Sequence, residues 1–212
     1  MLSSLRPSPI GTSNEATIGE RYPRDDKGVY NQYYGRILKH YEQLIDAIYQ
    51  TSGCPVVFPV GTDLIEKYLT GYELRYWAFD KSKLGLPNIE GFWEQDDHED
   101  GVINIYYNKN TNPNRQHFTK IHETLHVCQF LDSDFRRLID DIVLNNVLPL
   151  EMVQKLIERI TERTAATYLM PKEQTVKKYS ENKNILELAQ GFKVSVQTAM
   201  YRLNECGIMV PN

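Results

Sequence analysis

The sequence predicts an α+β fold in which a small antiparallel sheet lies between an N-terminal helix and a longer series of helices. Three segments between residues 73 and 107 are rich in aromatic and β-branched residues, which favour strands. Beyond residue 112, apolar side chains recur instead at the three- and four-residue spacing of amphipathic helices. Strands and helices grouped in separate parts of a chain are typical of α+β proteins.

The composition is that of an ordinary globular protein. Of 212 residues, 41% are hydrophobic and 25% charged, and the net charge of -4 gives no global sign of a nucleic-acid or membrane partner. Every apolar run is far shorter than the roughly 20 residues of a membrane span. Cys54, Cys128 and Cys206 fit neither a CxxC pair nor a disulfide framework, so we expect reduced thiols and a cytoplasmic protein.

The chain begins with a predicted flexible leader, residues 1–30, which lacks the apolar core of a signal peptide and is rich in Ser, Pro, Gly and charge. A helix follows and closes at Gly53; its apolar positions are Ile37, Tyr41, Leu44, Ile45 and Ile48. Thr62 or Asp63 could cap a short helix that ends at Gly71.

The three predicted strands are Glu73–Phe79, Ile89–Glu94 and Val102–Tyr107. The acidic segment Gln95–Gly101 contains a turn, so the second and third strands should form a hairpin.

The next helix should start at Asn112 and Pro113, a good N-cap and first-turn pair, and run to about Leu131. Helical spacing continues over Phe135–Val143 and over Leu150–Met170, which Pro171 ends. We expect residues 31–171 to form one α+β domain.

Residues 172–212 should form a small C-terminal helical unit. Its last two helices, Ile185–Gly191 and Ser195–Cys206, have helix-turn-helix proportions, with Ser195 as a cap. The side chains available to read bases are Gln197, Arg202 and Asn204. Because few positive charges accompany them, we favour a scaffold or protein-binding role, and direct DNA binding is the less favoured alternative.

One short motif carries the chemistry. The sequence His122-Glu123-Thr124-Leu125-His126 is an HExxH motif within a predicted helix. Residues four apart lie on one face of a helix, so both imidazoles can reach one zinc ion. Glu123 projects about 100° around the helix and can act as general base toward a water that zinc activates. An apolar stripe on the same helix should dock on the core: Phe118, Ile121, Leu125 and Cys128.

A third ligand is required, and the residues alone leave two candidates. Glu158 and Glu162 lie four apart on the helix that ends at Pro171, so they share a face. Either could instead be a solvated carboxylate paired with Arg159 or Arg163.

A wider pattern accompanies the motif. Before it come Ile105-Tyr106-Tyr107-Asn108, Arg115 and Phe118-Thr119; after it come Glu158, Ala165-Ala166, Tyr168-Leu169-Met170-Pro171, Leu188-Ala189, Phe192, Val194-Ser195 and Arg202-Leu203. This ordered set, from Ile105 to Ile208, resembles the ImmA/IrrE family of zinc metallopeptidases.

The resemblance implies a zincin-like metallopeptidase with one zinc ion per chain. It places the third ligand at Glu158 rather than Glu162. It also implies a protein substrate, typically a helix-turn-helix transcriptional repressor of a phage or mobile element. Two positions depart from the family: Leu125 replaces a small residue, and Glu162 replaces an Asn.

Substrate-binding residues are harder to assign. Ile105–Asn108 could be an edge strand on which a peptide lies by strand addition, which makes Tyr106, Tyr107 and Asn108 candidates; a purely structural strand is the alternative. His117, Tyr106 and Tyr168 are candidate stabilisers of an oxyanion.

The resulting hypothesis is a zinc-dependent metallo-endopeptidase that cleaves a protein. The alternative is a non-proteolytic regulator, or antirepressor, that binds a repressor or DNA with the same fold. Glu123 favours the enzyme, because a non-catalytic relative has no chemical need for a base there.

Overall fold

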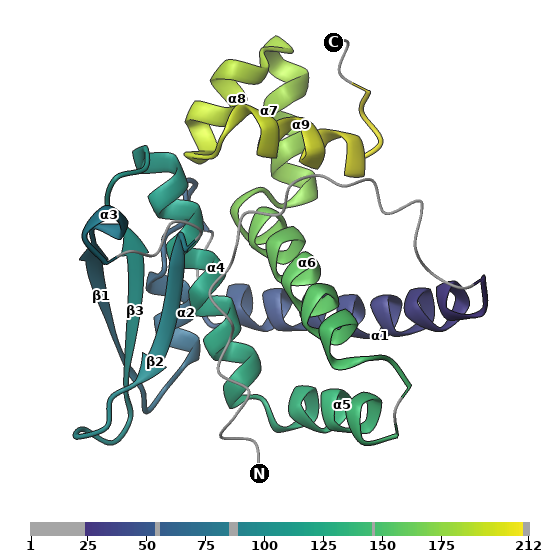
Figure 1. Ribbon diagram of the computed structural model, residues 1–212. Coiled ribbons are helices and arrows are strands. Elements are labelled where there is room, and N and C mark those ends of the chain that lie inside the picture. The colour runs from purple at the N-terminus through teal and green to yellow at the C-terminus, as the bar shows by residue number, and fades with distance from the viewer. Residues whose placement is uncertain (1–23, 54–55, 85–88, 146, 210–212) are drawn as a thin grey trace.

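The computed structural model describes residues 24–53, 56–84, 89–145 and 147–209 (Figure 1). The elements, in chain order, are α1 (Arg24–Gln50), α2 (Asp63–Tyr68), β1 (Glu73–Phe79), α3 (Lys81–Leu84), β2 (Gly91–Gln95), β3 (Val102–Asn108), α4 (Pro113–Leu131), α5 (Ser133–Leu144), α6 (Leu150–Leu169), α7 (Lys172–Asn182), α8 (Ile185–Phe192) and α9 (Val196–Glu205). One small sheet among many helices confirms the predicted α+β class. Most of the expected leader, residues 1–23, lies outside the described residues, and α1 begins at Arg24.

The sheet is mixed, so the prediction of an antiparallel sheet is wrong. Its strand order is β1-β3-β2: β3 pairs antiparallel with β2, as the predicted hairpin requires, and parallel with β1. The chain reverses direction twice between β1 and β3, so these two strands run the same way. Because β3 has a neighbour on each side, Ile105–Asn108 is a central segment and not the edge strand that we expected.

The two faces of the sheet have different surroundings. The inner face carries Ile103, Ile105 and Tyr107 of β3, of which the two isoleucines are fully buried and Tyr107 contacts Lys120 of α4. The outer face carries the alternate residues of the strands: Glu73, Arg75, Trp77 and Phe79 of β1, Phe92 and Glu94 of β2, and Val102, Asn104, Tyr106 and Asn108 of β3.

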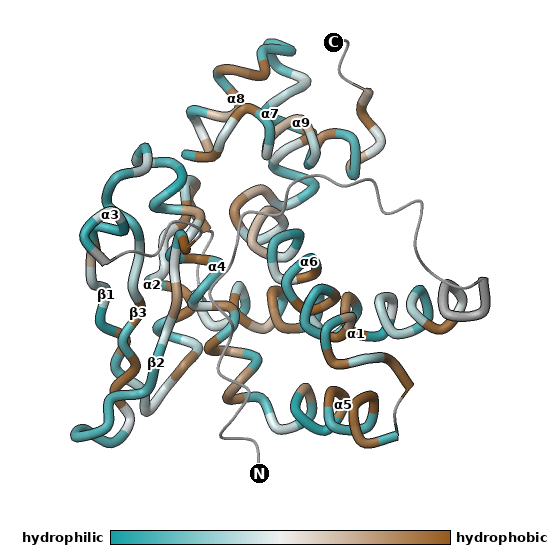
Figure 2. Tube along the Cα trace, in the orientation of Figure 1, coloured by the Kyte–Doolittle hydropathy of each residue, from teal (hydrophilic) through white to brown (hydrophobic). Residues whose placement is uncertain are grey.

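Helix α4 is the centre of the molecule. Asn112 accepts a hydrogen bond from the backbone N–H of Arg115, and Pro113 follows it, so the predicted start of this helix is confirmed. The predicted apolar stripe is buried, including Leu125, the residue that replaces a small residue of the family. Helix α6 packs against both α4 and α1, and the hydrophobic segments of these helices meet where they cross (Figures 1 and 2).

The helices after residue 170 dock on the end of α6. Ser195 caps α9, as predicted, by accepting a hydrogen bond from the N–H of Thr198. Arg202 is buried and donates its Nε–H to the carbonyl of Met170, so it is not available to read DNA, which agrees with the scaffold role that we favoured for these helices. Glu205 pairs with Arg163 of α6 at 3.0 Å. Among the described helices, none combines the length and hydropathy that crossing a membrane would need.

Candidate metal centre

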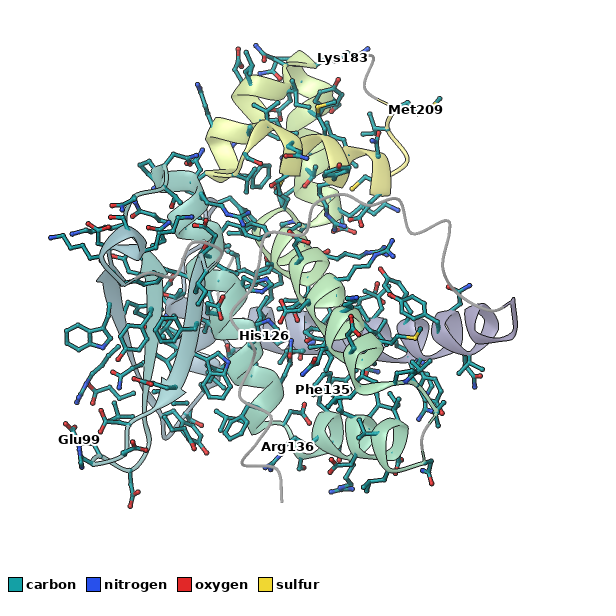
Figure 3. All side chains as sticks on the ribbon, in the orientation of Figure 1. Glu99, His126, Phe135, Arg136, Lys183 and Met209 are labelled. Atoms are coloured by element: carbon teal, nitrogen blue, oxygen red, sulfur yellow. The ribbon has the colours of Figure 1, made fainter. Side chains whose placement is uncertain are left out.

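Two imidazoles converge on one side of α4. His122 and His126 are one helical turn apart, and their Nε2 atoms are 3.0 Å from each other. Both side chains are almost completely buried. Figure 3 shows His126 on α4 in the region where this helix faces α6.

Glu158 reaches the same point from α6. Its Oε2 lies 3.4 Å from Nε2 of His122, and its Oε1 lies 3.4 Å from Nε2 of His126. The three donor atoms are within 4.8 Å of one another. Two ligands bound to zinc at 2.0–2.1 Å in tetrahedral geometry lie about 3.3 Å apart, so the spacing of these donors suits zinc.

Glu162 does not reach this cluster. Its side chain is exposed, and among the described residues the metal-binding group comprises His122, His126 and Glu158. Glu162 still acts at longer range, because its negative charge raises the pKa of His122 slightly against larger opposing effects.

A chain of hydrogen bonds fixes the orientation of His126. Its Nδ1 lies 3.0 Å from Oε1 of Gln129, and Nε2 of Gln129 donates to the hydroxyl of Thr161 at 2.7 Å. Thr161 donates in turn to the carbonyl of Ile157, so it can only accept from Gln129 and from Tyr41. The amide oxygen of Gln129 therefore faces the imidazole, and the neutral ring carries its proton on Nδ1. This leaves the lone pair of Nε2 directed at the metal position.

The charges in the cluster depend on one another. Burial alone would raise the pKa of Glu158, but the two imidazoles lower it well below its ordinary value. Burial alone would lower the pKa of His126, but the carboxylate of Glu158 raises it overall. Burial, with the neighbouring charge of His126, lowers the pKa of His122 despite the opposing effect of Glu158. A proton therefore competes with a metal for this site, and metal binding should weaken in acid.

Glu123 lies beside the cluster on the same helix. It is 1% exposed, and burial raises the pKa of its carboxyl to about 8. Its Oε1 atom has no hydrogen-bond partner among the described residues, which leaves it available to a water or a substrate. A protonatable carboxyl beside three metal-type ligands matches the group that an HExxH peptidase requires.

The backbone of β2 closes over this glutamate. A Cβ atom added to Gly91 would lie 2.9 Å from Cγ and from Oε1 of Glu123, and 2.5 Å from Cγ2 of Thr119. Only a residue without a side chain allows the strand to approach α4 this closely. Sequence reasoning missed Gly91, although an isolated glycine within a strand is a known signal of such an approach.

The three candidate substrate-binding residues do not share one face of the sheet. Tyr107 lies on the inner face, with Nζ of Lys120 4.1 Å from its ring centre. Tyr106 lies on the outer face and donates its hydroxyl proton to Glu94 at 2.8 Å. Asn108 is buried and donates to Oε2 of Glu90 at 2.9 Å.

Glu90 belongs to a second polar cluster, which lies beside Asn108 at the end of β3. Lys81 donates to its Oε1 at 2.7 Å. Burial would raise the pKa of Glu90, but Lys81 and Asn108 outweigh it and lower the pKa overall. Asn108 therefore has a structural contact that the sequence did not suggest.

The three candidates for an oxyanion stabiliser have contacts elsewhere. Tyr106 bonds Glu94, and Tyr168 donates its hydroxyl proton to the carbonyl of Gly61 at 2.7 Å. Burial lowers the pKa of His117 despite the opposing effect of the Val60 backbone, and its Nε2 atom has no hydrogen-bond partner among the described residues. Thr161 and Tyr41, which support the metal ligands, were not recognised from the sequence because their contacts link distant segments.

A buried HExxH helix faced by a glutamate from a second helix is typical of one class of metal-dependent peptidases. Residues 90–204 match the Peptidase_M78 family, described as the IrrE N-terminal-like domain, and the chain belongs to this family. The match confirms the resemblance drawn from the motifs, and it crosses the expected boundary between residues 171 and 172.

Among solved structures, a Mycobacterium tuberculosis transcriptional regulator is similar in fold, with a TM-score of 0.54 and 16% sequence identity. The similarity covers 86% of this chain and 52% of the regulator, so the chain spans about half the length of that protein. No protein of curated function is a significant match to this sequence.

Proposed function

We propose that the chain is a zinc-dependent metallo-endopeptidase of zincin-like architecture. His122, His126 and Glu158 would hold one zinc ion, and Glu123 would be the general base and acid. The observation that carries this proposal is the convergence of three donor atoms within 4.8 Å, next to a buried carboxyl whose pKa is raised to about 8.

A divalent metal at this position would polarise the scissile carbonyl and lower the pKa of a nearby water. Glu123 would take a proton from the attacking water and then donate it to the leaving amine. Burial raises the pKa of Glu123, which opposes the lowering that a nearby metal cation would cause and so favours a group that both accepts and donates a proton. Gln129 and Thr161 would keep the Nε2 lone pair of His126 directed at the metal throughout.

The proposed substrate is a helix-turn-helix transcriptional repressor of a phage or mobile element. Membership of the peptidase family and the regulator of similar fold both support a regulatory partner, and a cytoplasmic site of action suits such a partner. The alternative, a regulator that binds a repressor without cleaving it, makes a different prediction for Glu123.

The test combines metal content with cleavage. Purified wild-type protein should carry about one zinc per chain, and His126→Ala and Glu158→Ala should lose it. Glu123→Gln should keep the zinc yet fail to cut helix-turn-helix repressors encoded beside its gene, as followed by electrophoresis and mass spectrometry. Cleavage by Glu123→Gln at the wild-type rate would refute the mechanism, and repressor binding without cleavage by the wild type would favour the alternative.

A further inference from the structure

An aromatic row crosses the outer face of the sheet. Trp77, Tyr106 and Phe92 occupy paired positions on β1, β3 and β2, so their side chains stand next to one another on one face. The rings of Phe92 and Tyr106 are stacked, with centroids 4.5 Å apart. Trp77 is 50% exposed. Large exposed aromatic side chains on a folded domain are typical of contact surfaces.

Hydrogen bonds hold this row in place. Trp77 donates its indole N–H to Oδ1 of Asn104 at 2.8 Å, and Asn104 donates to Oδ2 of Asp96 at 3.0 Å. Tyr106 is fixed by its bond to Glu94. Because the polar atoms of the row already have partners, the exposed ring faces are available for contact at little cost in conformational entropy.

The surroundings of the row are strongly acidic. The adjoining parts of the strands and their hairpin carry six carboxylates: Glu73, Glu94, Asp96, Asp97, Glu99 and Asp100. Arg75 is the one lysine or arginine in segments 72–77 and 92–106, and it already pairs with Glu73 and Glu99. Glu99 lies at the far end of the hairpin, where the surface is hydrophilic (Figures 2 and 3).

Strand β2 connects this face to the metal centre. Helix α4 packs on the inner face, where Gly91 abuts Glu123. The next residue, Phe92, points to the outer face and joins the aromatic row. A partner held on the outer face is therefore separated from the proposed catalytic carboxyl by the thickness of the sheet at β2.

We propose that the outer face is a docking surface for a basic segment of the protein substrate, in which arginine or lysine alternates with apolar side chains. The inference rests on the proposed function. One guanidinium stacks on the face of Trp77 and pairs with Glu94, which is paired in register with Asn104, the partner of the indole. A further basic side chain of the segment pairs with Asp97 or Asp100 in the hairpin turn, while apolar side chains cover Phe92 and Tyr106. Proteins that bind DNA display such basic surfaces, so the charge of the proposed substrate class complements this face.

Two other occupants fit the same observations less well. A nucleic acid would bring its phosphates against the carboxylates of the hairpin. A second copy of the chain in a two-fold contact would place six carboxylates opposite the same six.

The test uses the full chain and two fluorescein-labelled peptides of 14 residues. One carries five arginines and three leucines in a Gly/Ser background, and the other has glutamate in place of each arginine. Anisotropy at physiological salt should show binding of the arginine peptide only. Trp77→Ala should weaken that binding about five- to tenfold, as expected for loss of a cation–π contact and its apolar area.

A charge variant tests the contribution of the carboxylates to binding, and its result does not depend on whether Trp77→Ala folds correctly. Asp97→Lys with Asp100→Lys should weaken binding at least about tenfold. Asp141→Lys with Glu181→Lys, on exposed positions of α5 and α7, changes the net charge equally and should leave binding within about twofold. Equal losses in both double variants, or equal binding of both peptides, would overturn the proposal. The proposal would also be overturned if sedimentation showed that the wild-type chain self-associates and that the outer-face variants abolish this association.

The same preparations separate this inference from the proposed function. Trp77→Ala should keep the zinc content and the rate of hydrolysis of unfolded, acidic β-casein, while raising KM for a basic repressor about fivefold. The protein could bind the arginine peptide, lose that binding in the outer-face variants, and yet neither hold zinc nor cut casein. This result would support the docking surface and refute the proposed peptidase activity. An unchanged KM for the repressor, in a protein that holds zinc and cuts casein, would refute docking alone.

Discussion

Replacing Gly91 by alanine should both destabilise the protein and displace its proposed general base. The added Cβ would lie 2.5 Å from Cγ2 of Thr119 and 2.9 Å from Cγ of Glu123, which is too close for either pair. Cγ2 of Thr119 and Cγ of Glu123 are each bonded directly to a Cβ of α4, so neither atom can move far unless the strand or the helix shifts. Overpacking of this kind costs about 1–3 kcal/mol, which corresponds to a fall of about 2–12 °C in Tm for a chain of this size.

The functional effect should exceed the effect on stability. Displacing a catalytic group by 1 Å can slow a reaction about 100-fold, so we expect a loss of that order in kcat. Zinc content should stay the same, because none of the three atoms nearest to the added Cβ belongs to His122, His126 or Glu158. The measurements are thermal denaturation by circular dichroism, metal analysis and hydrolysis of β-casein.

Gly35→Ala is the matched control. Gly35 is exposed within α1, and an added Cβ there meets no atom within 4 Å. Alanine in a helix is favoured over glycine by about 0.5–1 kcal/mol, so Tm should rise by about 1–4 °C and activity should not change. A Gly91→Ala variant with the Tm and kcat of the wild type would refute the close packing of β2 on Glu123.

Three further predictions concern charged side chains. Glu162→Gln should keep the zinc and Glu158→Gln should lose it, as measured by mass spectrometry of the metal; the reverse result would move the third ligand to Glu162. Glu90→Gln should lower the free energy of unfolding by about 1–3 kcal/mol at pH 7. Because its polar partners outweigh burial and depress the folded-state pKa of Glu90, this stabilisation exists above the unfolded pKa and is lost as pH falls through the folded pKa. Denaturant titrations should therefore show wild type and variant converging below about pH 4, and a constant difference would contradict the assignment. Asp132→Ala should cost about 0.5–2 kcal/mol by removing the cap of α5, whereas Asp132→Asn should keep most of that stability; equal losses would show that the cap contributes little.

Local signals located α4, the helix that carries the HExxH motif, well. Asn112 and Pro113 define its start through capping geometry, and the HExxH spacing places two imidazoles and a carboxyl on known faces. These features depend on residues within one or two helical turns, so they can be read without knowledge of the rest of the chain. The weakly amphipathic α7 was not predicted, because Thr175 is its one buried residue in the described chain and gives no apolar period.

Pairing between distant segments could not be read in the same way. The local pattern of β3 is the same whether the strand is central or at an edge, and only the position of β1 beside it decides. Arginine is a side chain that often reads bases, so the sequence left a DNA-reading role for Arg202 open as an alternative, and the packing of α9 against α6 buries it. Both features depend on a partner that lies far away in the sequence.

The sequence by itself determined the α+β class, the peptidase family and the motif that carries the chemistry, because each is written in local spacing or in an ordered set of residues. The tertiary structure decided the rest. Glu158 and Glu162 share one face of α6, and only the packing of α6 on α4 brings one of them to the imidazoles. The close approach of β2 to α4 helps to bury Glu123, and this burial raises its pKa, since burial depends on what surrounds a side chain and not on its neighbours along the chain.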